Sequence, residues 1–96
     1  MKMLQIICDS GFEEYLLERL EKEGIKSFTK IEKALGKGNS SQPHMDSHIW
    51  PGFHVLYFIA VSDEDYGRIK QMLLEIKEKI KREGFKVFVY NILEEI

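Results

Sequence analysis

Hydrophobic and polar residues follow two periodicities along this chain, one typical of strands and one typical of helices. Both halves of the chain show these segments in the same order. The first apolar run, residues 3–8, is short and includes the β-branched Ile6 and Ile7, which is typical of a buried strand. A polar stretch with helical spacing follows it, and then a second extended segment. This order predicts a strand–helix–strand unit in the first third of the chain.

The first predicted helix has its apolar positions four residues apart, with Leu16 and Leu20 on one stripe. Ser10 is the expected N-cap, and Glu13 three residues later completes a capping box, with its side chain expected to face water. Gly24 is expected to end the helix, because glycine adopts the left-handed conformation at little cost. Residues 25–35 then predict a polar strand, which favours an edge position.

The second half repeats this order with stronger signals. Residues 53–61 contain one polar side chain, His54, and predict a strand. Ser62 is the expected cap of a second helix, which Gly84 is expected to stop, and residues 86–92 predict a last strand. The apolar face of this helix comprises Tyr66, Ile69, Leu73, Ile76 and Ile80.

A short sequence repeat supports the division into halves, because Glu23–Phe28 (EGIKSF) recurs as Glu83–Phe88 (EGFKVF). Two strand–helix–strand units predict an α+β, ferredoxin-like βαββαβ fold, in which a four-stranded antiparallel sheet carries two helices on one face. We expect a single domain over residues 1–96. Residues 36–52 form a long connection rich in glycine, serine and proline, and connections of this length are usually functional or mobile.

The face of the sheet that the helices leave uncovered is predicted to be apolar. The two strands expected at the centre, 3–8 and 53–61, are apolar on both alternating sets of positions. A large apolar patch in water marks an interface. We therefore expect a homo-oligomer that packs sheet against sheet, in preference to a loop that folds back over the face.

Composition excludes several classes of protein. The 96 residues include 14 basic and 16 acidic side chains, and this balance disfavours a nucleic-acid partner. The single cysteine, Cys8, excludes an internal disulfide, and no apolar run reaches the roughly 20 residues that insertion into a membrane requires. The expected location is the cytoplasm. Asp9 and Ser10 with a distant histidine form no catalytic triad, because Ser10 is better explained as a cap, so we expect no enzyme activity.

Two motifs resemble the nitrogen-regulatory PII proteins: Val61–Glu64 (VSDE) at the start of the second helix, and Gly84–Val89 (GFKVFV) in the last strand. The long connection at 36–52 resembles the T-loop of that family. The resemblance implies a homotrimer with ligand sites in the clefts between subunits. It further implies signal transduction through the loop, with an adenine nucleotide as ligand and an enzyme or transporter as protein partner.

The resemblance also places candidate ligand-binding residues. The lysine that contacts nucleotide phosphate in the family corresponds to Lys86, and the start of the T-loop corresponds to Gly36, Lys37 and Gly38. The alternative for Lys86 is an ordinary exposed lysine, because Lys26 occupies the equivalent place in the repeat. The family's arginines beyond the last strand and its T-loop tyrosine have no counterpart here, which indicates a short, divergent PII-like protein.

A second hypothesis is a metal site in the same loop. His44, Asp46 and His48 are close in sequence, and imidazole with carboxylate suits zinc, nickel or copper, with Cys8 as a further ligand. The CutA-like divalent-ion-tolerance proteins, another trimeric PII-like group, make a divalent-metal-binding trimer the alternative function. A solvated polar loop is the simpler interpretation of these residues.

Overall fold

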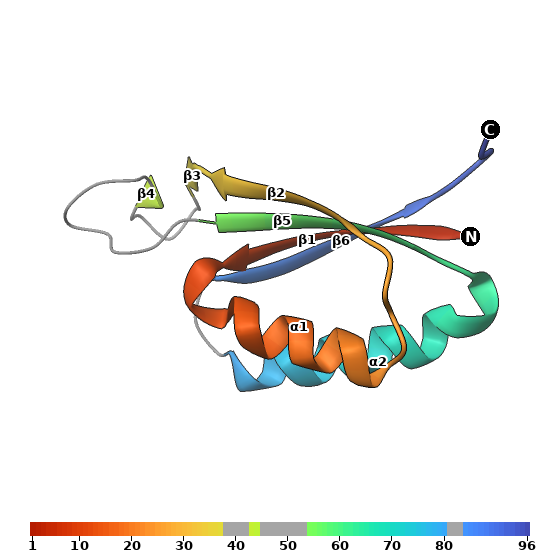
Figure 1. The fold of residues 1–96 in the computed structure, drawn as a ribbon, viewed down its shortest axis with the longest axis horizontal. Helices are drawn as coiled ribbons and strands as arrows, with labels where there is room; N and C mark the ends of the chain where they lie inside the picture. Colours follow the sequence, from red (N-terminus) through yellow and green to blue (C-terminus); the bar gives the residue numbers. More distant parts are fainter. Residues whose placement is uncertain (38–42, 45–53, 81–83) are drawn as a thin grey trace.

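The computed structural model describes residues 1–37, 43–44, 54–80 and 84–96, and it shows a β-sheet with two helices packed on one face (Figure 1). The elements in chain order are β1 (Lys2–Asp9), a 3-10 turn (Ser10–Phe12), α1 (Glu13–Lys22), β2 (Thr29–Ala34), β3 (Gly36–Lys37), β4 (Pro43–His44), β5 (His54–Val61), α2 (Asp63–Lys79) and β6 (Phe85–Asn91). Within these described residues, neither helix combines the length and apolar character needed to cross a bilayer.

The main sheet has the strand order β2-β5-β1-β6, and each neighbouring pair is antiparallel. This order confirms the predicted ferredoxin-like fold, with β1 and β5 at the centre and the polar β2 at an edge. Leu4 is level with Ile59 on β5 and with Val89 on β6, so these three side chains point to the same face. The register therefore shows on which of the two faces of the sheet each residue of the three strands lies.

The hydrophobic core lies between the sheet and the helices. Alternate residues of the two central strands are at most 1% exposed on this face: Leu4, Ile6, Cys8, Val55, Tyr57 and Ile59. The helices contribute the residues that their spacing predicts, with Leu16 and Leu20 from α1 and Ile69, Leu73 and Ile76 from α2. The tight packing of this layer gives a rigid support for the loops at its ends.

Of the four predicted helix ends, the end of α1 and the start of α2 are confirmed, and the end of α2 is wrong. Gly24 follows α1 with φ of 81°, and the Ser62 hydroxyl accepts a hydrogen bond from the backbone N–H of Asp65 at 3.1 Å. The second helix, however, ends at Lys79 and not at Gly84. Ile80 leaves the helical conformation with ψ of 86°, and its side chain is buried in the core, so packing ends this helix before the glycine does.

The predicted capping box at the start of α1 is also wrong. Asp9 caps the 3-10 turn, because its carboxylate accepts a hydrogen bond from the backbone N–H of Gly11 at 2.9 Å. α1 begins three residues later than the turn, at Glu13, and Phe12 at its N-cap makes no side-chain capping bond. Glu13 does not face open water either, because its carboxylate is bound to Tyr57 and Lys30.

Part of the long connection is ordered into a second, two-stranded sheet. β3 and β4 pair antiparallel, with Gly36 opposite His44 and Lys37 opposite Pro43. The sequence pattern gave no sign of this pairing, because neither strand is longer than two residues. The rest of the predicted loop, residues 38–42 and 45–52, lies outside the described residues.

Candidate functional site

The candidate ligand-binding residues lie at one end of the main sheet. β1 and β2 end there, β5 and β6 begin there, and β3 continues from β2 at the same end (Figure 1). Lys86 is the second residue of β6, and Gly36 and Lys37 form β3. Gly38 lies outside the described residues. The fold thus brings the described candidates to a common end of the molecule, although they are about 50 residues apart in sequence.

These candidates nevertheless belong to opposite edges of the sheet. Lys86 is on the edge strand β6, whereas β3 follows the other edge strand, β2. Strands are spaced about 4.8 Å apart, so three steps from β6 to β2 separate the two edges by roughly 14 Å. That distance exceeds the reach of a single phosphate group. A site that uses both edges requires either a ligand of nucleotide length or a second copy of the chain.

Lys86 differs from Lys26, its counterpart in the sequence repeat, because its backbone belongs to a strand. It is an exposed strand residue paired with Ile7 of β1, and the register places it on the sheet face that the helices do not cover. Lys26 is also exposed, but it precedes β2 and belongs to no strand. The sequence repeat therefore does not extend to the local structure, and only Lys86 is held by a sheet.

A bend at Gly84, held by a hydrogen bond to the end of β1, fixes the start of β6 and with it the position of Lys86. The backbone N–H of Asp9 donates a hydrogen bond to the carbonyl oxygen of Gly84 at 2.7 Å. Gly84 has φ of 133°, and a Cβ at this position would lie 3.1 Å from the Phe12 ring and 3.2 Å from the Cβ of Asp9. Both the conformation and the space require glycine. This contact links the end of β1 to the residue two positions before Lys86.

The metal hypothesis rests on residues that lie largely outside the described part of the chain. His44 is in β4, and Asp46 and His48 belong to residues 45–53. Cys8 is completely buried in the core, and burial, with smaller contributions from the charges of Asp9 and Glu13, raises its pKa to about 12. A thiol with this pKa is a poor source of the thiolate that binds metals. Across the described ranges, no three histidine, cysteine or acidic side chains are grouped to hold a metal ion.

A polar cluster that the sequence analysis did not identify links three elements next to the core. The hydroxyl group of the buried Tyr57 on β5 donates a hydrogen bond to the carboxylate of Glu13 at the start of α1. The same carboxylate oxygen accepts from Lys30 Nζ of β2 at 2.6 Å. Tyr57 also contacts Phe28, edge to face, with 5.2 Å between the ring centroids.

The charges of this cluster are mutually compensated. Partial burial raises the pKa of Glu13, but the hydrogen bonds from Lys30 and Tyr57 and the charge of Lys30 outweigh it, so the pKa is lowered overall. Burial and the bond to Glu13 raise the pKa of Tyr57, which stays protonated. The one sequence signal was a tyrosine at an inward position of a buried strand, because a buried hydroxyl needs an acceptor. The cluster secures the first residues of β2, the strand that leads into β3.

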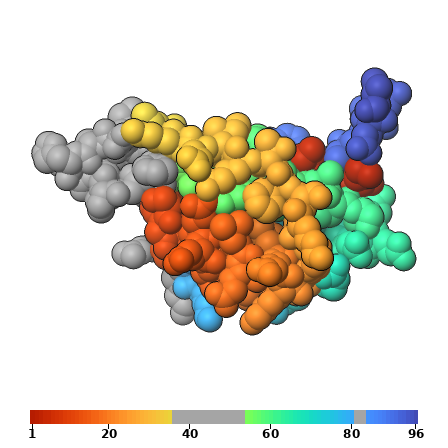
Figure 2. All heavy atoms as spheres, in the orientation of Figure 1, coloured from red at the N-terminus to blue at the C-terminus, as the bar shows by residue number. Residues whose placement is uncertain are grey.

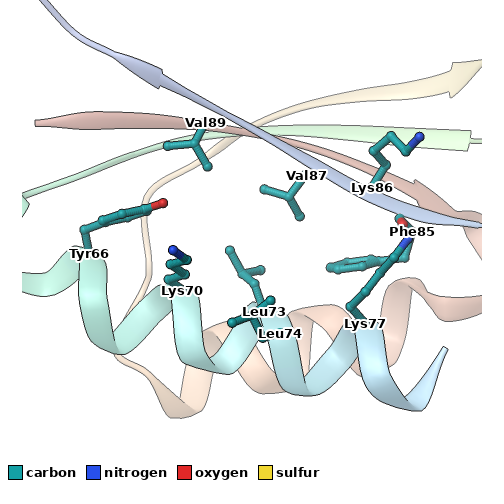
Figure 3. A pocket seen from close by; sticks show the side chains of 9 residues that line it. All are labelled: Tyr66, Lys70, Leu73, Leu74, Lys77, Phe85, Lys86, Val87 and Val89. Carbon is teal, nitrogen blue, oxygen red and sulfur yellow. Dashed lines mark hydrogen bonds between the residues drawn. The ribbon is translucent and has the colours of Figure 1, made fainter. Parts of the chain in front are cut away.

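A groove of about 330 Å³ lies between α2 and the edge strand β6 (Figure 3). The walls of the groove are apolar, formed by Leu73 and Leu74 of α2 and by Val87 and Val89 of β6. Phe85 closes one end of the groove and Tyr66 stands at the other, and Lys70 and Lys77 of α2 lie along it. Lys86 of β6 borders the groove, but its side chain points away from it. Lys77 Nζ donates a hydrogen bond to the carbonyl oxygen of Phe85 at 2.5 Å, which ties the helix to the start of β6.

Comparison with known proteins identifies the family. The family model described as nitrogen regulatory protein P-II matches residues 1–96, the whole chain. A search of curated proteins returned no match. The chain belongs to the nitrogen regulatory protein P-II family.

Solved structures show the same fold. CPII from Thiomonas intermedia K12, bound to ADP and bicarbonate, is 23% identical, with a TM-score of 0.74 over 95% of this chain and 84% of that one. CPII bound to ADP, AMP and acetate is 25% identical, with a TM-score of 0.69 and the same two coverages. A PII-like signaling protein from Thermus thermophilus is 27% identical, with a TM-score of 0.66, again over 95% and 84% of the two chains.

Proposed function

We propose that this member of the P-II family is a homotrimeric regulatory protein without enzyme activity. It binds a small anionic ligand, an adenine nucleotide, in the clefts between its subunits. Residues 36–52 report the bound state to a protein partner, an enzyme or a transporter. The observation that carries the proposal is the match of the family model to all 96 residues, together with two candidate cations, Lys37 and Lys86, at one end of the sheet.

The position of the candidates supports a site shared between copies. Lys86 and β3 are separated by the width of the sheet within one chain. Neighbouring copies that meet at their edges bring the start of β6 in one copy near β3 in the next. A phosphate then receives backbone N–H groups and one ammonium group from Gly36, Lys37 and Gly38. Lys86 of the neighbouring copy supplies a second positive charge from the other side.

The open face of the sheet supports association of the copies. Its partly exposed residues include Ile7, Leu56 and Phe58, and Phe88 and Tyr90 on β6 are 45% and 50% exposed. Apolar surface of this kind is stabilised when a second molecule covers it. Stable interfaces bury at least about 1,000 Å² in total, and an open four-stranded sheet is large enough to provide that area.

The solved relatives support the proposed ligand class. The CPII structures hold ADP with bicarbonate, and ADP and AMP with acetate. ATP, ADP and AMP, each with and without bicarbonate, are therefore the ligands to titrate first by calorimetry. We expect one nucleotide site per chain in an assembly whose mass is three times that of the monomer.

Lys86→Ala is the decisive variant, and Lys26→Ala is its matched control. Both lysines are exposed and follow the same Glu-Gly-apolar sequence, but only Lys86 lies in the sheet. Lys86→Ala is expected to weaken nucleotide binding at least tenfold, because it removes a charge-assisted contact to phosphate, while Lys26→Ala binds normally. Equal binding by both variants would overturn the assignment of Lys86, and no nucleotide binding by the unmodified chain would overturn the function.

The metal hypothesis gives a different result in the same titrations. If His44, Asp46 and His48 hold a divalent metal, zinc or copper binding is lost in a His44→Ala, His48→Ala double variant and kept in Lys86→Ala. Nucleotide binding that survives the double variant supports the regulatory proposal. Hydrolysis of ATP that is lost in Lys86→Ala would show an enzyme and contradict it.

A further inference from the structure

The groove between α2 and β6 has two apolar walls, and the helix wall also carries lysines. Each wall presents aliphatic residues, Leu73 and Leu74 on α2 and Val87 and Val89 on β6 (Figure 3). The lysines that face the groove, Lys70 and Lys77, belong to the helix, because Lys86 of β6 points to the open face of the sheet. No acidic side chain is among the described residues that line the groove. The groove therefore suits an extended segment that is both apolar and acidic.

The ion pairs on the helices show that these lysines are not needed to hold the two helices together. Arg19 of α1 pairs with Glu75 of α2 at 2.6 Å, and Arg68 of α2 pairs with Glu23 at 2.5 Å. These contacts lie where α2 meets α1. The lysines of the groove are on the side of α2 that faces β6, where the lining offers them no carboxylate.

The residues after β6 have the complementary composition. Leu93 is 97% exposed and Ile96 is also fully exposed, and Glu94 and Glu95 lie between them. Exposed aliphatic side chains of this size, next to two acids, have no role in the fold of their own chain. Extended over four residues, the segment spans about 13 Å. The α2 wall from Tyr66 to Lys77 is about 16 Å long, so the lengths match.

The segment cannot reach the groove of its own chain. The backbone N–H of Ile92 donates a hydrogen bond to the carbonyl oxygen of Met1 at 3.0 Å, and Lys2 Nζ donates to the Asn91 side chain at 2.5 Å. These contacts hold the end of β6 in line with the strand. Beyond it the chain runs away from the helices, on the side of the sheet opposite to the groove (Figure 1).

We infer that residues 93–96 of one copy dock in the α2–β6 groove of a second copy. In an extended segment, successive side chains point to opposite sides, so each wall receives one aliphatic and one acidic residue. The aliphatic side chains extend the apolar walls, and the carboxylate on the helix side pairs with Lys70 and Lys77. This contact is distinct from the packing of open sheet faces, and it requires no nucleotide.

The inference is tested by reversing the charges of residues 94 and 95, then those of the groove lysines, and then both together. Glu94→Lys with Glu95→Lys places positive charge against the lysines, and Lys70→Glu with Lys77→Glu places negative charge against the acids. Each double variant is expected to raise the dissociation constant for self-association at least tenfold, measured by sedimentation. The quadruple variant restores opposite charges and is expected to return within about threefold of the unmodified chain.

Matched controls keep the result interpretable. Glu18→Lys with Glu21→Lys, and Lys22→Glu, change exposed charges on α1, far from the groove, and are expected to leave association unchanged. A quadruple variant as weak as either double variant, or double variants that associate normally, would overturn the inference. If an open-face variant such as Phe88→Asp dissociates the copies while tail reversal does not, the oligomer stands and only this docking fails.

A cross-link gives a readout that does not depend on stability. Two preparations of the chain, both with Cys8→Ala, are mixed and oxidised. One carries Leu93→Cys and the other carries Leu74→Cys. A disulfide between the two kinds of chain is expected in the mixture, and Glu18→Cys in place of Leu93→Cys is expected to give none. Equal cross-linking of Leu74→Cys by Leu93→Cys and by Glu18→Cys would contradict the docking.

Discussion

The two faces of the sheet contain similar side chains in very different surroundings. On the face that the helices cover, alternate residues of β1 and β5 are almost completely buried (Figure 1). On the open face, Ile31, Phe88 and Tyr90 are between 45% and 50% exposed. In Figure 2 the segment after β6 projects from the body of the molecule, away from the helices. The comparison shows that one face satisfies the fold of a single chain, while the other keeps apolar side chains exposed, and in our proposal it meets another chain.

The largest expected contrast between the faces is chemical and concerns Cys8, on the covered face. A pKa of about 12 instead of the usual 9.0 lowers the fraction of thiolate roughly a thousandfold at about pH 8. Iodoacetamide is therefore expected to alkylate the native chain at least a thousandfold more slowly than the chain in concentrated guanidinium chloride. Because Cys8 is the only cysteine, mass spectrometry reports this reaction directly. Rapid native labelling would show that the covered face opens.

A matched pair of isoleucines tests how much each face contributes to stability. Ile59 is 1% exposed on the covered face, and Ile31 is 47% exposed on β2. Ile59→Ala is expected to lower the free energy of unfolding by about 3 kcal/mol, because it leaves a cavity, and Ile31→Ala by less than about 1 kcal/mol. Urea denaturation measures both. Similar losses would mean that an intermolecular contact already buries the open face under the conditions of the measurement.

A charge on the open face is expected to act on association more than on folding. Phe88→Asp places a carboxylate among apolar residues that, in our proposal, meet another copy. The dissociation constant of the oligomer should rise at least tenfold in sedimentation experiments, while the far-ultraviolet circular dichroism spectrum stays native. Lys22→Asp adds negative charge on α1 and should leave the mass unchanged. An unaltered mass for Phe88→Asp would remove this face from the interface.

The smallest expected effect concerns the Glu13–Tyr57–Lys30 cluster beside the covered face. Because the pKa of Glu13 is lowered in the folded chain, its ionised form stabilises the fold above its ordinary value of 4.5, and this contribution is lost as the pH falls through the folded pKa. Glu13→Gln is expected to cost about 1 kcal/mol at neutral pH and to flatten this acid dependence. Glu21→Gln, at an exposed position, is the control. An unchanged pH profile for Glu13→Gln would assign the acid dependence to other carboxyl groups.

Local sequence signals were sufficient for most of the fold. The stripe of Leu16 and Leu20, the cap at Ser62 and the glycine at 24 each act within one turn of helix, so the residues nearby decide the outcome. The polar character of residues 29–34 likewise indicated an edge strand. The same signals were insufficient at Ser10 and at the end of α2. There, Asp9 and the burial of Ile80 decided where the helices begin and end.

The sequence by itself determined the order of the main strands and helices and their inward residues, because hydrophobic period and turn chemistry are properties of neighbouring residues. The candidate cations came from the resemblance to the PII proteins. Only the tertiary structure decided what those residues meet. Tyr57 reaches Glu13 across 44 positions, Lys86 and β3 lie at opposite edges, and the lysine groove arises between α2 and β6. Strand pairing brings such distant residues together, and its order is set by the packing of the whole chain and not by any segment alone.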